Sequence, residues 1–275
     1  MPNSASIAHG ADAALLAGLA DAALAAGAVV MRIRAEGVSV RTKADSSPVT
    51  AADLASEDLL RAHLERLLPG VPVVAEEAVA QGRGETPGER FLLVDPLDGT
   101  REFLAENGEF TINVALVEHG VPRLGILYAP AVGRLYAGGA GGAFRALRVP
   151  GAAADPESWQ PISCRPVPER GLIAVASRSH LDAATAALLA KLDIAERQSC
   201  GSALKFALVA EGHADFYPRL GPVSEWDVAA GHAIVVAAGG AVTRPDGTAL
   251  PYGRTEARYG VPAFVAWGRG ARPPF

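Results

Sequence analysis

The sequence predicts an α+β protein whose two halves are built in different ways. Residues 111–144 contain short apolar strands separated by close turns, which is typical of an antiparallel meander. After residue 168, strand and helix segments alternate, which is typical of an α/β unit. The intervening segment 149–168 is rich in Pro and Ala and lacks periodicity. We therefore predict an N-terminal α+β half, residues 1–150, and a C-terminal α/β half, residues 151–275.

Composition places the chain among globular proteins. Its 275 residues are 49% hydrophobic and 20% charged, which excludes a disordered chain and allows ample core. The net charge of −5 argues against broad nucleic-acid contact, which requires a basic surface. Two cysteines, Cys164 and Cys200, cannot form a zinc site alone, and free thiols in a reducing compartment are favoured over one disulfide. We expect a cytoplasmic protein and leave open a peripheral contact with the inner membrane.

The first element is expected to be a core helix. The segment 13–31 is apolar enough to raise the question of a membrane span, but Asp21 interrupts it. The remaining run, 22–31, is too short to cross a bilayer, and no basic region precedes it as in a signal peptide. Helical spacing places one apolar face on this segment: Leu15, Leu19, Ala23, Ala26, Val30 and Ile33.

Turn residues and periodicity delimit the other elements. A polar loop over 43–50 precedes a helix over 51–68, which stops at Pro69-Gly70 and places Leu60, Leu64 and Leu67 on one face. The Gly-rich, charged stretch 81–90 is expected to be a surface loop. Outside the meander, we expect strands at 72–75, 91–94, 172–176, 194–198, 215–217 and 263–267, and helices at 182–192, 202–211 and 227–238.

Two carboxylates emerge where the strand 91–94 ends, in the run Asp95-Pro-Leu-Asp-Gly-Thr100. Asp95 and Asp98, with the carbonyl of Leu97 between them, suit a hard oxygen-liganded cation such as Mg²⁺. The turn that follows can receive a phosphate on its N–H groups. Asp-Pro and Asp-Gly also form ordinary turns. A third strand end that is nearby in the sequence carries Glu76, however, and three carboxylates close together would repel strongly without a cation between them. A metal beside a phosphate is the chemistry of phosphate-ester hydrolysis.

Other acids allow both structural and functional interpretations. Glu76 and Glu77 are adjacent, so their side chains diverge and only one is expected to bind a metal directly. Thr50 and Asp53 have the spacing of a capping box, while a carboxylate held by a threonine hydroxyl can also serve a general-base relay. Asp227 can be a helix N-cap, yet it ends a dense run of turn, aromatic and charged residues that is typical of a functional loop.

A possible anion site begins the helix after Gly201. The N–H groups and dipole of a helix N-terminus attract anions, and Lys205 lies there without favouring the dipole. The alternative is a solvent-facing Lys205 on a helix that Ser202 caps.

These motifs together resemble the inositol monophosphatase superfamily of lithium-sensitive, Mg²⁺-dependent phosphatases. The resemblance covers nearly the whole chain and rests on Glu76-Glu77, the run Asp95–Thr100, and Trp226-Asp227-Val-Ala-Ala-Gly231. Within the superfamily, the sequence is most similar to the CysQ-type branch of 3′(2′),5′-bisphosphate nucleotidases. The segments that carry this narrower resemblance are Lys43–Asp53, Arg101–Thr111, Ser177–His180, Gly201–Phe206 and Tyr217–Asp227. Ala75 departs from the family, which often has a small polar residue or glycine there, but no ligand is lost.

The resemblance implies a layered αβαβα sandwich of the inositol monophosphatase and fructose-1,6-bisphosphatase type, with two or three Mg²⁺ ions. It implies that Thr100, with Asp53 or Glu77, activates the attacking water, and that Gly99 and Thr100 bind the scissile phosphate. The implied metal ligands are Glu76, Asp95, the Leu97 carbonyl, Asp98 and Asp227. The implied residues at the nucleotide end are Ser202 and Lys205, with Tyr217, Arg219 and Glu225 shaping the pocket.

The expected substrate is a small phosphorylated nucleotide, with adenosine 3′,5′-bisphosphate converted to AMP and phosphate in sulfur metabolism. One alternative keeps the metal chemistry and acts on an inositol or sugar phosphate. A second is a phosphatase with an aspartyl nucleophile, although the two residues between Asp95 and Asp98 do not match its motif. A third is a nucleotide-binding regulatory protein on an inactive scaffold. We expect no nucleic-acid partner, no transmembrane segment, and a monomer or homodimer.

Overall fold

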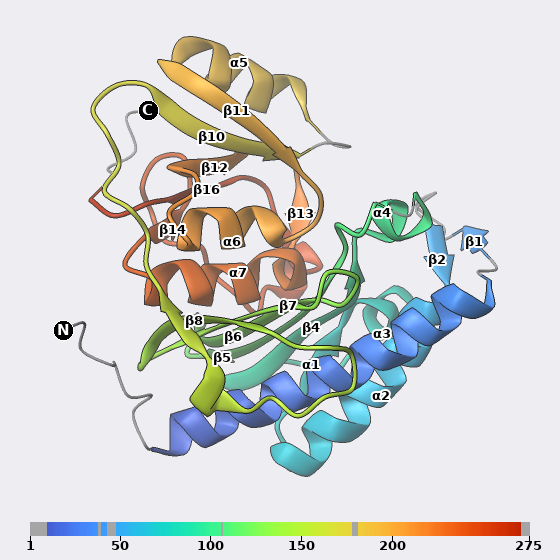
Figure 1. The fold of residues 1–275 in the computed structure, drawn as a ribbon. Helices are drawn as coiled ribbons and strands as arrows, with labels where there is room; N and C mark the ends of the chain where they lie inside the picture. The colour runs from blue at the N-terminus through green and yellow to red at the C-terminus, as the bar shows by residue number, and fades with distance from the viewer. Residues whose placement is uncertain (1–9, 38–39, 43–47, 106, 178–180, 271–275) are drawn as a thin grey trace.

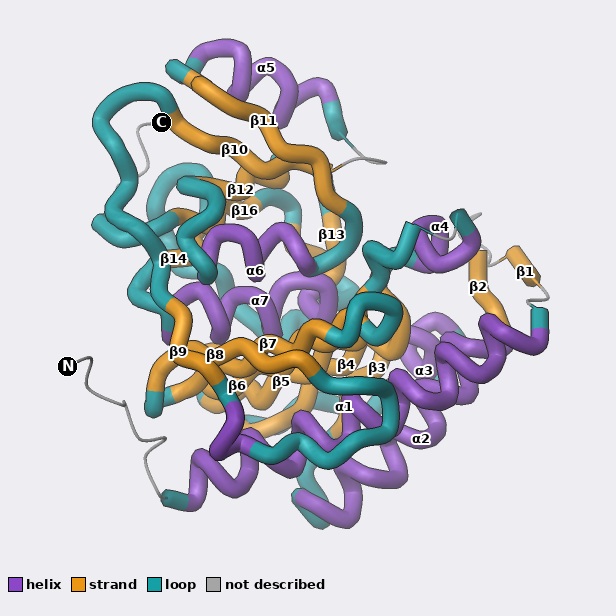
Figure 2. The backbone as a smooth tube through the Cα atoms, in the orientation of Figure 1, coloured by secondary structure: helices purple, strands orange, loops and turns teal. Residues whose placement is uncertain are grey.

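The computed structural model describes residues 10–37, 40–42, 48–105, 107–177 and 181–270, which stack in five layers (Figure 1). The layers are a helix pair, a large mixed sheet, a second helix pair, a smaller sheet and a single outer helix, and Figure 2 shows the second helix pair between the two strand layers. The expected αβαβα sandwich is therefore confirmed. The helices, in the order of the layers, are α1 (Ala11–Glu36) and α2 (Ala51–Leu67), α6 (Leu204–Ala210) and α7 (Glu225–Ala237), and α5 (Ala183–Lys191).

Among the described residues, the large sheet has seven strands, and the first is parallel to the second while all other neighbours are antiparallel. The meander predicted over 111–144 is confirmed, and it continues into a short strand that the sequence did not reveal, within the Pro- and Ala-rich segment. In sheet order the strands are β3 (Val73–Ala75), β4 (Arg90–Asp98), β5 (Thr111–Glu118), β6 (Val121–Ala129), β7 (Arg134–Gly139), β8 (Gly142–Leu147) and β9 (Gln160–Ile162).

The smaller sheet has the order β11-β10-β12-β16-β14 within the described chain. Its first three strands are parallel, and β16 is antiparallel to both of its neighbours. Its strands are β10 (Leu172–Ser177), β11 (Ile194–Cys200), β12 (Phe216–Arg219), β14 (Ala241–Thr243) and β16 (Phe264–Trp267). In the part of the chain that the structure describes, four further strands form two small pairs: β1 (Val40–Thr42) with β2 (Pro48–Thr50), and β13 (Val223–Ser224) with β15 (Gly260–Val261).

Helix α7 joins the two halves, because it packs on β5, β6 and β7 of the large sheet and on α6. Two glycines allow this close approach. A Cβ on Gly125 would lie 2.4 Å from the carbonyl oxygen of Ala230, and one on Gly138 would lie 2.5 Å from the Cα of Ile234. Apolar residues of both halves belong to one core cluster, so the site-bearing start of α7 is fixed against the first sheet. Whether the two halves are separate domains stays a prediction.

Helix α1 is a packed core element. By length and composition its span Asp12–Glu36 would suffice to cross a membrane, and half of its most apolar window is buried inside the protein. The predicted apolar face is confirmed: Leu19, Ala23, Ala26 and Val30 are fully buried, and Leu15 and Ile33 pack against the same cluster.

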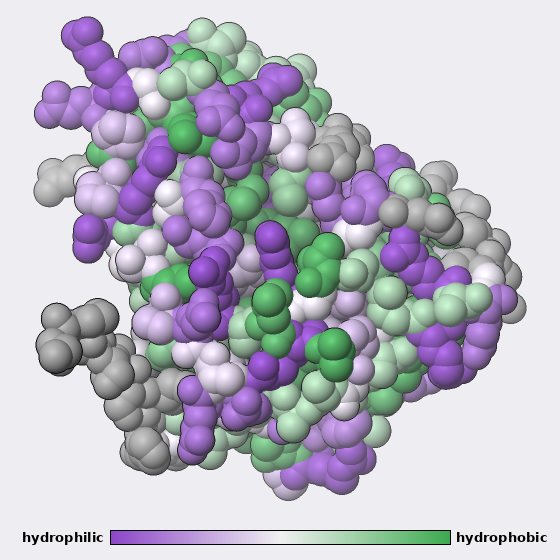
Figure 3. Space-filling model, in the orientation of Figure 1, coloured by the Kyte–Doolittle hydropathy of each residue, from purple (hydrophilic) through white to green (hydrophobic). Residues whose placement is uncertain are grey.

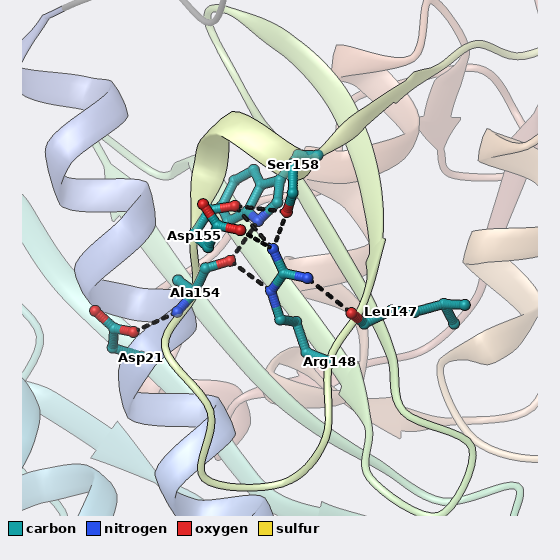
Figure 4. A network of polar contacts seen from close by, with 7 residues as sticks. Asp21, Leu147, Arg148, Ala154, Asp155 and Ser158 are labelled. Carbon is teal, nitrogen blue, oxygen red and sulfur yellow. Dashed lines mark hydrogen bonds and ion pairs between the residues drawn. The ribbon is translucent and has the colours of Figure 1, made fainter.

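A polar network ties the segment after β8 to α1 (Figure 4). Asp21, the residue that interrupts the apolar stretch, accepts a hydrogen bond of 2.7 Å from the Ala154 amide. The guanidinium of Arg148 turns inward and donates to the Ala154 carbonyl at 2.9 Å and to Asp155 at 2.8 Å, and it also contacts Ser158. The residues on either side of Arg148, Leu147 and Val149, are exposed instead. Figure 3 shows that the face of the molecule turned to the viewer mixes apolar side chains with hydrophilic ones.

The ion pair between Arg165 and Asp215 offers a test of how the segment after β9 is held. Arg165 meets Asp215 through two bonds of 2.7 Å, and Asp215 is fully buried. We expect Arg165→Ala to lower the free energy of unfolding by about 3 kcal/mol, because it leaves a buried carboxylate without its cation. Urea unfolding followed by circular dichroism measures this loss.

The matched control is Arg32→Ala, which removes an exposed ion pair with Glu36 on α1. That change should cost at most about 0.5 kcal/mol. Equal losses for the two variants would contradict the importance assigned to Asp215.

Candidate metal centre

Strand pairing brings the predicted acids together at one edge of the large sheet. In the parallel pair β3 and β4, Ala75 lies beside Val94, so Glu76 and Asp95 follow at the same end of two neighbouring strands. Asp227 arrives from the first turn of α7. Within the described chain, carboxylate oxygens of Asp95, Asp98 and Asp227 lie within 4.8 Å of one another. Glu76 lines the cleft beside them.

An irregularity in β4 allows both of its aspartates to reach this cluster. Residues three apart on a regular strand face opposite sides of the sheet. The pairing of β4 with β5 shifts between Asp95 and Asp98, which lie opposite Asn113 and Thr111, and such a shift re-aims side chains. The amide of Leu97 also donates to Asp95 Oδ1 at 3.0 Å, which fixes that carboxylate.

Asp227 is held by a capping box, although it is not the N-cap. Helix α7 begins at Glu225, two residues before the predicted start, and its N-cap is Ser224. The Ser224 amide donates to Asp227 Oδ2 at 2.7 Å. The N-cap interpretation of Asp227 is therefore wrong, because Ser224 takes that position and Asp227 lies in the first turn.

The electrostatics of the cluster favour a bound cation. Burial raises the pKa of Asp95 well above its ordinary value, and the nearby carboxylates of Glu76, Asp98 and Asp227 add to the effect. Burial, with Asp98 and Glu76, raises the pKa of Asp227 to about 7. Apart from the neighbouring Asp227 carboxyl, the buried Oδ2 of Asp95 has no hydrogen-bond partner among the described residues. A set of hard oxygen donors with an unsatisfied buried oxygen fits a divalent metal ion.

The capping box at the start of α2 is confirmed, and it also reaches the site. Asp53 Oδ2 accepts from the Thr50 amide at 2.8 Å and from the Thr50 hydroxyl at 2.7 Å. The hydroxyl of Thr100 lies 3.2 Å from Asp53 Oδ1 and 3.5 Å from the Leu97 carbonyl oxygen. Asp53 can therefore take part in the capping box of α2 and contact Thr100 at the same time.

Gly99 and Thr100 form the turn into the short helix α4 (Thr100–Leu104). Gly99 has a φ of 90°, a left-handed conformation that favours glycine. A Cβ there would also lie 3.2 Å from Glu102 Oε2 and 3.3 Å from the Cβ of Ser202. The turn is thus enclosed by α4 and by the segment before α6.

Glu77 directly follows Glu76, which lines the cleft, in the chain. It belongs to the short helix α3 (Glu76–Ala80), is buried, and donates its backbone amide to Glu57 Oε2 at 2.7 Å. Glu76 lines the cleft and Glu77 does not, as expected for adjacent side chains that diverge.

The cleft has a volume of about 240 Å³. Its far wall is formed by Ser202, Lys205, Tyr217 and Arg219. Lys205 is buried, so the solvent-facing alternative is wrong. Its Nζ donates to the carbonyls of Cys200 and Ser202 and lies 5.3 Å from the centre of the Tyr217 ring. Ser202 does not cap α6, because the helix begins at Leu204 after Ala203.

Glu225 is the predicted pocket residue that the structure places elsewhere. It is fully buried, and its carboxylate accepts from the backbone amides of Gly253 at 2.6 Å and Arg254 at 2.9 Å. It does not line the cleft. Its contacts anchor a distant loop, so we assign it no contact with a substrate. The motif residues 43–47 and 178–180 lie outside the described residues.

Sequence reasoning missed two residues of α2 that touch the metal-bearing segments, Ser56 and Glu57. The Ser56 hydroxyl donates to the Pro96 carbonyl at 2.7 Å, and Glu57 accepts from Glu77 as described. Both are buried. The available signal was their helical spacing from Asp53 on the face that continues into Leu60 and Leu64, where a polar residue is unusual.

This fold and this acidic cluster define a family. The model of the inositol monophosphatase family matches residues 12–267, and the chain belongs to that family, whose members depend on metal ions. Among its relatives, the 3′(2′),5′-bisphosphate nucleotidase CysQ of Escherichia coli (strain K12) is 43% identical over 211 residues, which are 76% of this chain and 80% of that protein. The CysQ nucleotidase of Salmonella typhimurium is 44% identical over 211 residues, with the same coverage of 76% and 80%.

Solved structures agree with the family assignment. CysQ from Bacteroides thetaiotaomicron has a TM-score of 0.78 at 35% identity, covering 93% of this chain and 97% of that one. An inositol monophosphatase from Anabaena has a TM-score of 0.72 at 30% identity, covering 93% and 91%.

The raised carboxyl pKa values predict that metal binding depends on pH. Asp95 and Asp227 hold their protons more tightly in the folded state than in the unfolded state. In metal-free protein, their contribution to stability is therefore present below about pH 4 and is lost as the pH rises through the pKa of Asp227, about 7. A divalent cation replaces the protons. We therefore expect MgCl₂, relative to EDTA, to raise the melting temperature more at pH 8 than at pH 5.5.

Asp227→Asn is the matched variant, because it removes one titrating carboxyl and keeps its size. Its melting temperature should respond less to MgCl₂ at pH 8. A shift of equal size at both pH values in the unsubstituted protein would argue against proton competition at the cluster.

Proposed function

We propose that the protein is a Mg²⁺-dependent 3′(2′),5′-bisphosphate nucleotidase that hydrolyses adenosine 3′,5′-bisphosphate to AMP and phosphate. The observation that carries this proposal is the 43% identity to a nucleotidase of that name across 76% of the chain. The acidic cluster supports it, because carboxylate oxygens are the ligands that Mg²⁺ prefers.

The proposed ligands of two or three Mg²⁺ ions are Glu76, Asp95, the Leu97 carbonyl, Asp98 and Asp227. When bound, the ions supply positive charge that lowers the pKa of a water and stabilises the leaving oxygen. The protein supplies the relay for the proton. The Thr100 hydroxyl donates to Asp53, so its oxygen can accept a proton from the attacking water while its own proton passes to Asp53. This contact favours Asp53 over Glu77 as the partner of Thr100.

The scissile phosphate is proposed to bind on the backbone N–H groups of Gly99 and Thr100, next to the metal ligands. The opposite wall offers donors for a second phosphate. Ser202 and Arg219 line the cleft, and the buried hydroxyl of Ser202 and Nε of Arg219 have no hydrogen-bond partner among the described residues. Lys205 adds a positive charge beside them, and Tyr217 closes the wall.

These unsatisfied donors favour a bisphosphate over an inositol or sugar monophosphate, because a buried donor without an acceptor is costly. An aspartyl nucleophile is disfavoured, because Asp95 is fully buried and Asp98 is held by the Ala203 amide at 2.6 Å. A regulatory binder would not need the clustered carboxylates, which destabilise a fold that lacks a cation.

A substrate panel tests the proposed specificity. With Mg²⁺, we expect phosphate release from adenosine 3′,5′-bisphosphate with a kcat/KM at least about 100-fold above that for inositol 1-phosphate, because the second phosphate adds charge-assisted hydrogen bonds. Omission of Mg²⁺ should abolish release, and Li⁺ should reduce it. A preference for inositol 1-phosphate would reject the nucleotide assignment, and absence of release from every substrate would favour a binding protein.

Asp95→Asn tests the metal assignment. Loss of one carboxylate misplaces the charge that stabilises the transition state, so kcat should fall by at least about 100-fold. Glu89→Gln is the control, because Glu89 is exposed just before β4, at the end opposite Asp95. Near-normal kcat for Asp95→Asn at saturating Mg²⁺ would falsify the assignment.

A further inference from the structure

One face of α2 changes character along its length. Asp53, Ser56 and Glu57 lie at helical spacing on the buried face, with exposures of 2%, 0% and 3%. The same face continues into Leu60 and Leu64, which belong to the apolar core. The polar part of this face is therefore at the metal end of the helix, and each of its three residues contacts a different segment of the site.

Ser56 holds one peptide unit of the metal-bearing loop. The Pro96 carbonyl and the Leu97 amide belong to the same peptide group. Ser56 Oγ donates to that carbonyl at 2.7 Å, while the amide donates to Asp95 Oδ1 at 3.0 Å. The peptide is thus fixed on both edges, which orients the Asp95 carboxylate and the Leu97 carbonyl that follows.

Glu57 holds the turn that carries Glu76. Helix α3 starts directly after β3, and its N-cap, Ala75, has no side chain that can accept a hydrogen bond. Glu57 supplies the acceptor from another helix, at 2.7 Å from the Glu77 amide. A bond to the amide next to Glu76 fixes the backbone from which that side chain reaches the cleft.

We infer that Ser56 and Glu57 are positioning residues of the metal centre, which set the Asp95–Leu97 loop and the Glu76 turn at the spacing that a cation requires. This inference rests on the metal-dependent function proposed above. A neutral acceptor would satisfy the Glu77 amide equally well. Glu57 instead places a second carboxyl group near Glu76, within reach of the positive charge of Arg61.

The test is Mn²⁺ binding to protein stripped with EDTA, followed by electron paramagnetic resonance without substrate. Residues that hold metal ligands in place typically contribute about 10- to 100-fold to affinity, so Ser56→Ala and Glu57→Ala should each weaken Mn²⁺ binding by that factor. Glu57→Gln keeps one acceptor oxygen and should lose less. Asp58→Asn is the matched control, because Asp58 is the next residue on α2 and is exposed.

Melting temperatures in EDTA and kinetics distinguish positioning from a structural role. Positioning predicts that Glu57→Gln melts in EDTA close to the unsubstituted protein, and that excess Mg²⁺ restores most of its kcat while the KM for the nucleotide is unchanged. Unchanged Mn²⁺ affinity in Ser56→Ala and Glu57→Ala, with or without a lower melting temperature, overturns the inference. Because Mn²⁺ binding is measured without substrate, a protein that binds Mn²⁺ but releases no phosphate would reject the proposed function and leave this test valid.

Discussion

Repulsion among carboxylates confined to one point is the constraint on which the molecule depends. Asp95, Asp98 and Asp227 bring oxygens within 4.8 Å of one another, and Asp95 is wholly buried. Such a cluster opposes folding until a cation neutralises it. Packing between the layers must therefore keep the acids together. Gly125 and Gly138 have no side chains, which lets α7, the helix that carries Asp227, pack closely on the large sheet.

The two walls of the cleft carry opposite charge. The large sheet and the first turn of α7 provide the acids, while helix α6 and strand β12 provide Lys205 and Arg219. The walls also touch, because the Ala203 amide donates to Asp98 at 2.6 Å. Movement of the cationic wall would thus be felt at the acidic cluster.

Local pattern predicted much of this organisation. Periodicity located α1, α2, the meander and the alternating second half, and the spacing of Asp95 and Asp98 indicated a metal site. It failed where partners distant in sequence decide the outcome. Strand β9 and the pair β13–β15 are too short to leave a periodic signal. The burial of Lys205 depends on Tyr217 and on two carbonyls, and Ser224 replaced Asp227 as the cap because the two belong to one capping box.

The order of these elements along the chain has a consequence for synthesis. Asp95 and Asp98 leave the ribosome early, on β4, whereas Asp227 follows only after the meander and most of the smaller sheet. Domains fold as units while translation proceeds, so a nascent chain can form the large sheet with an incomplete set of acids. The sheet face that α7 later covers stays open during that interval, and the set of acids is complete only once α7 packs on that face.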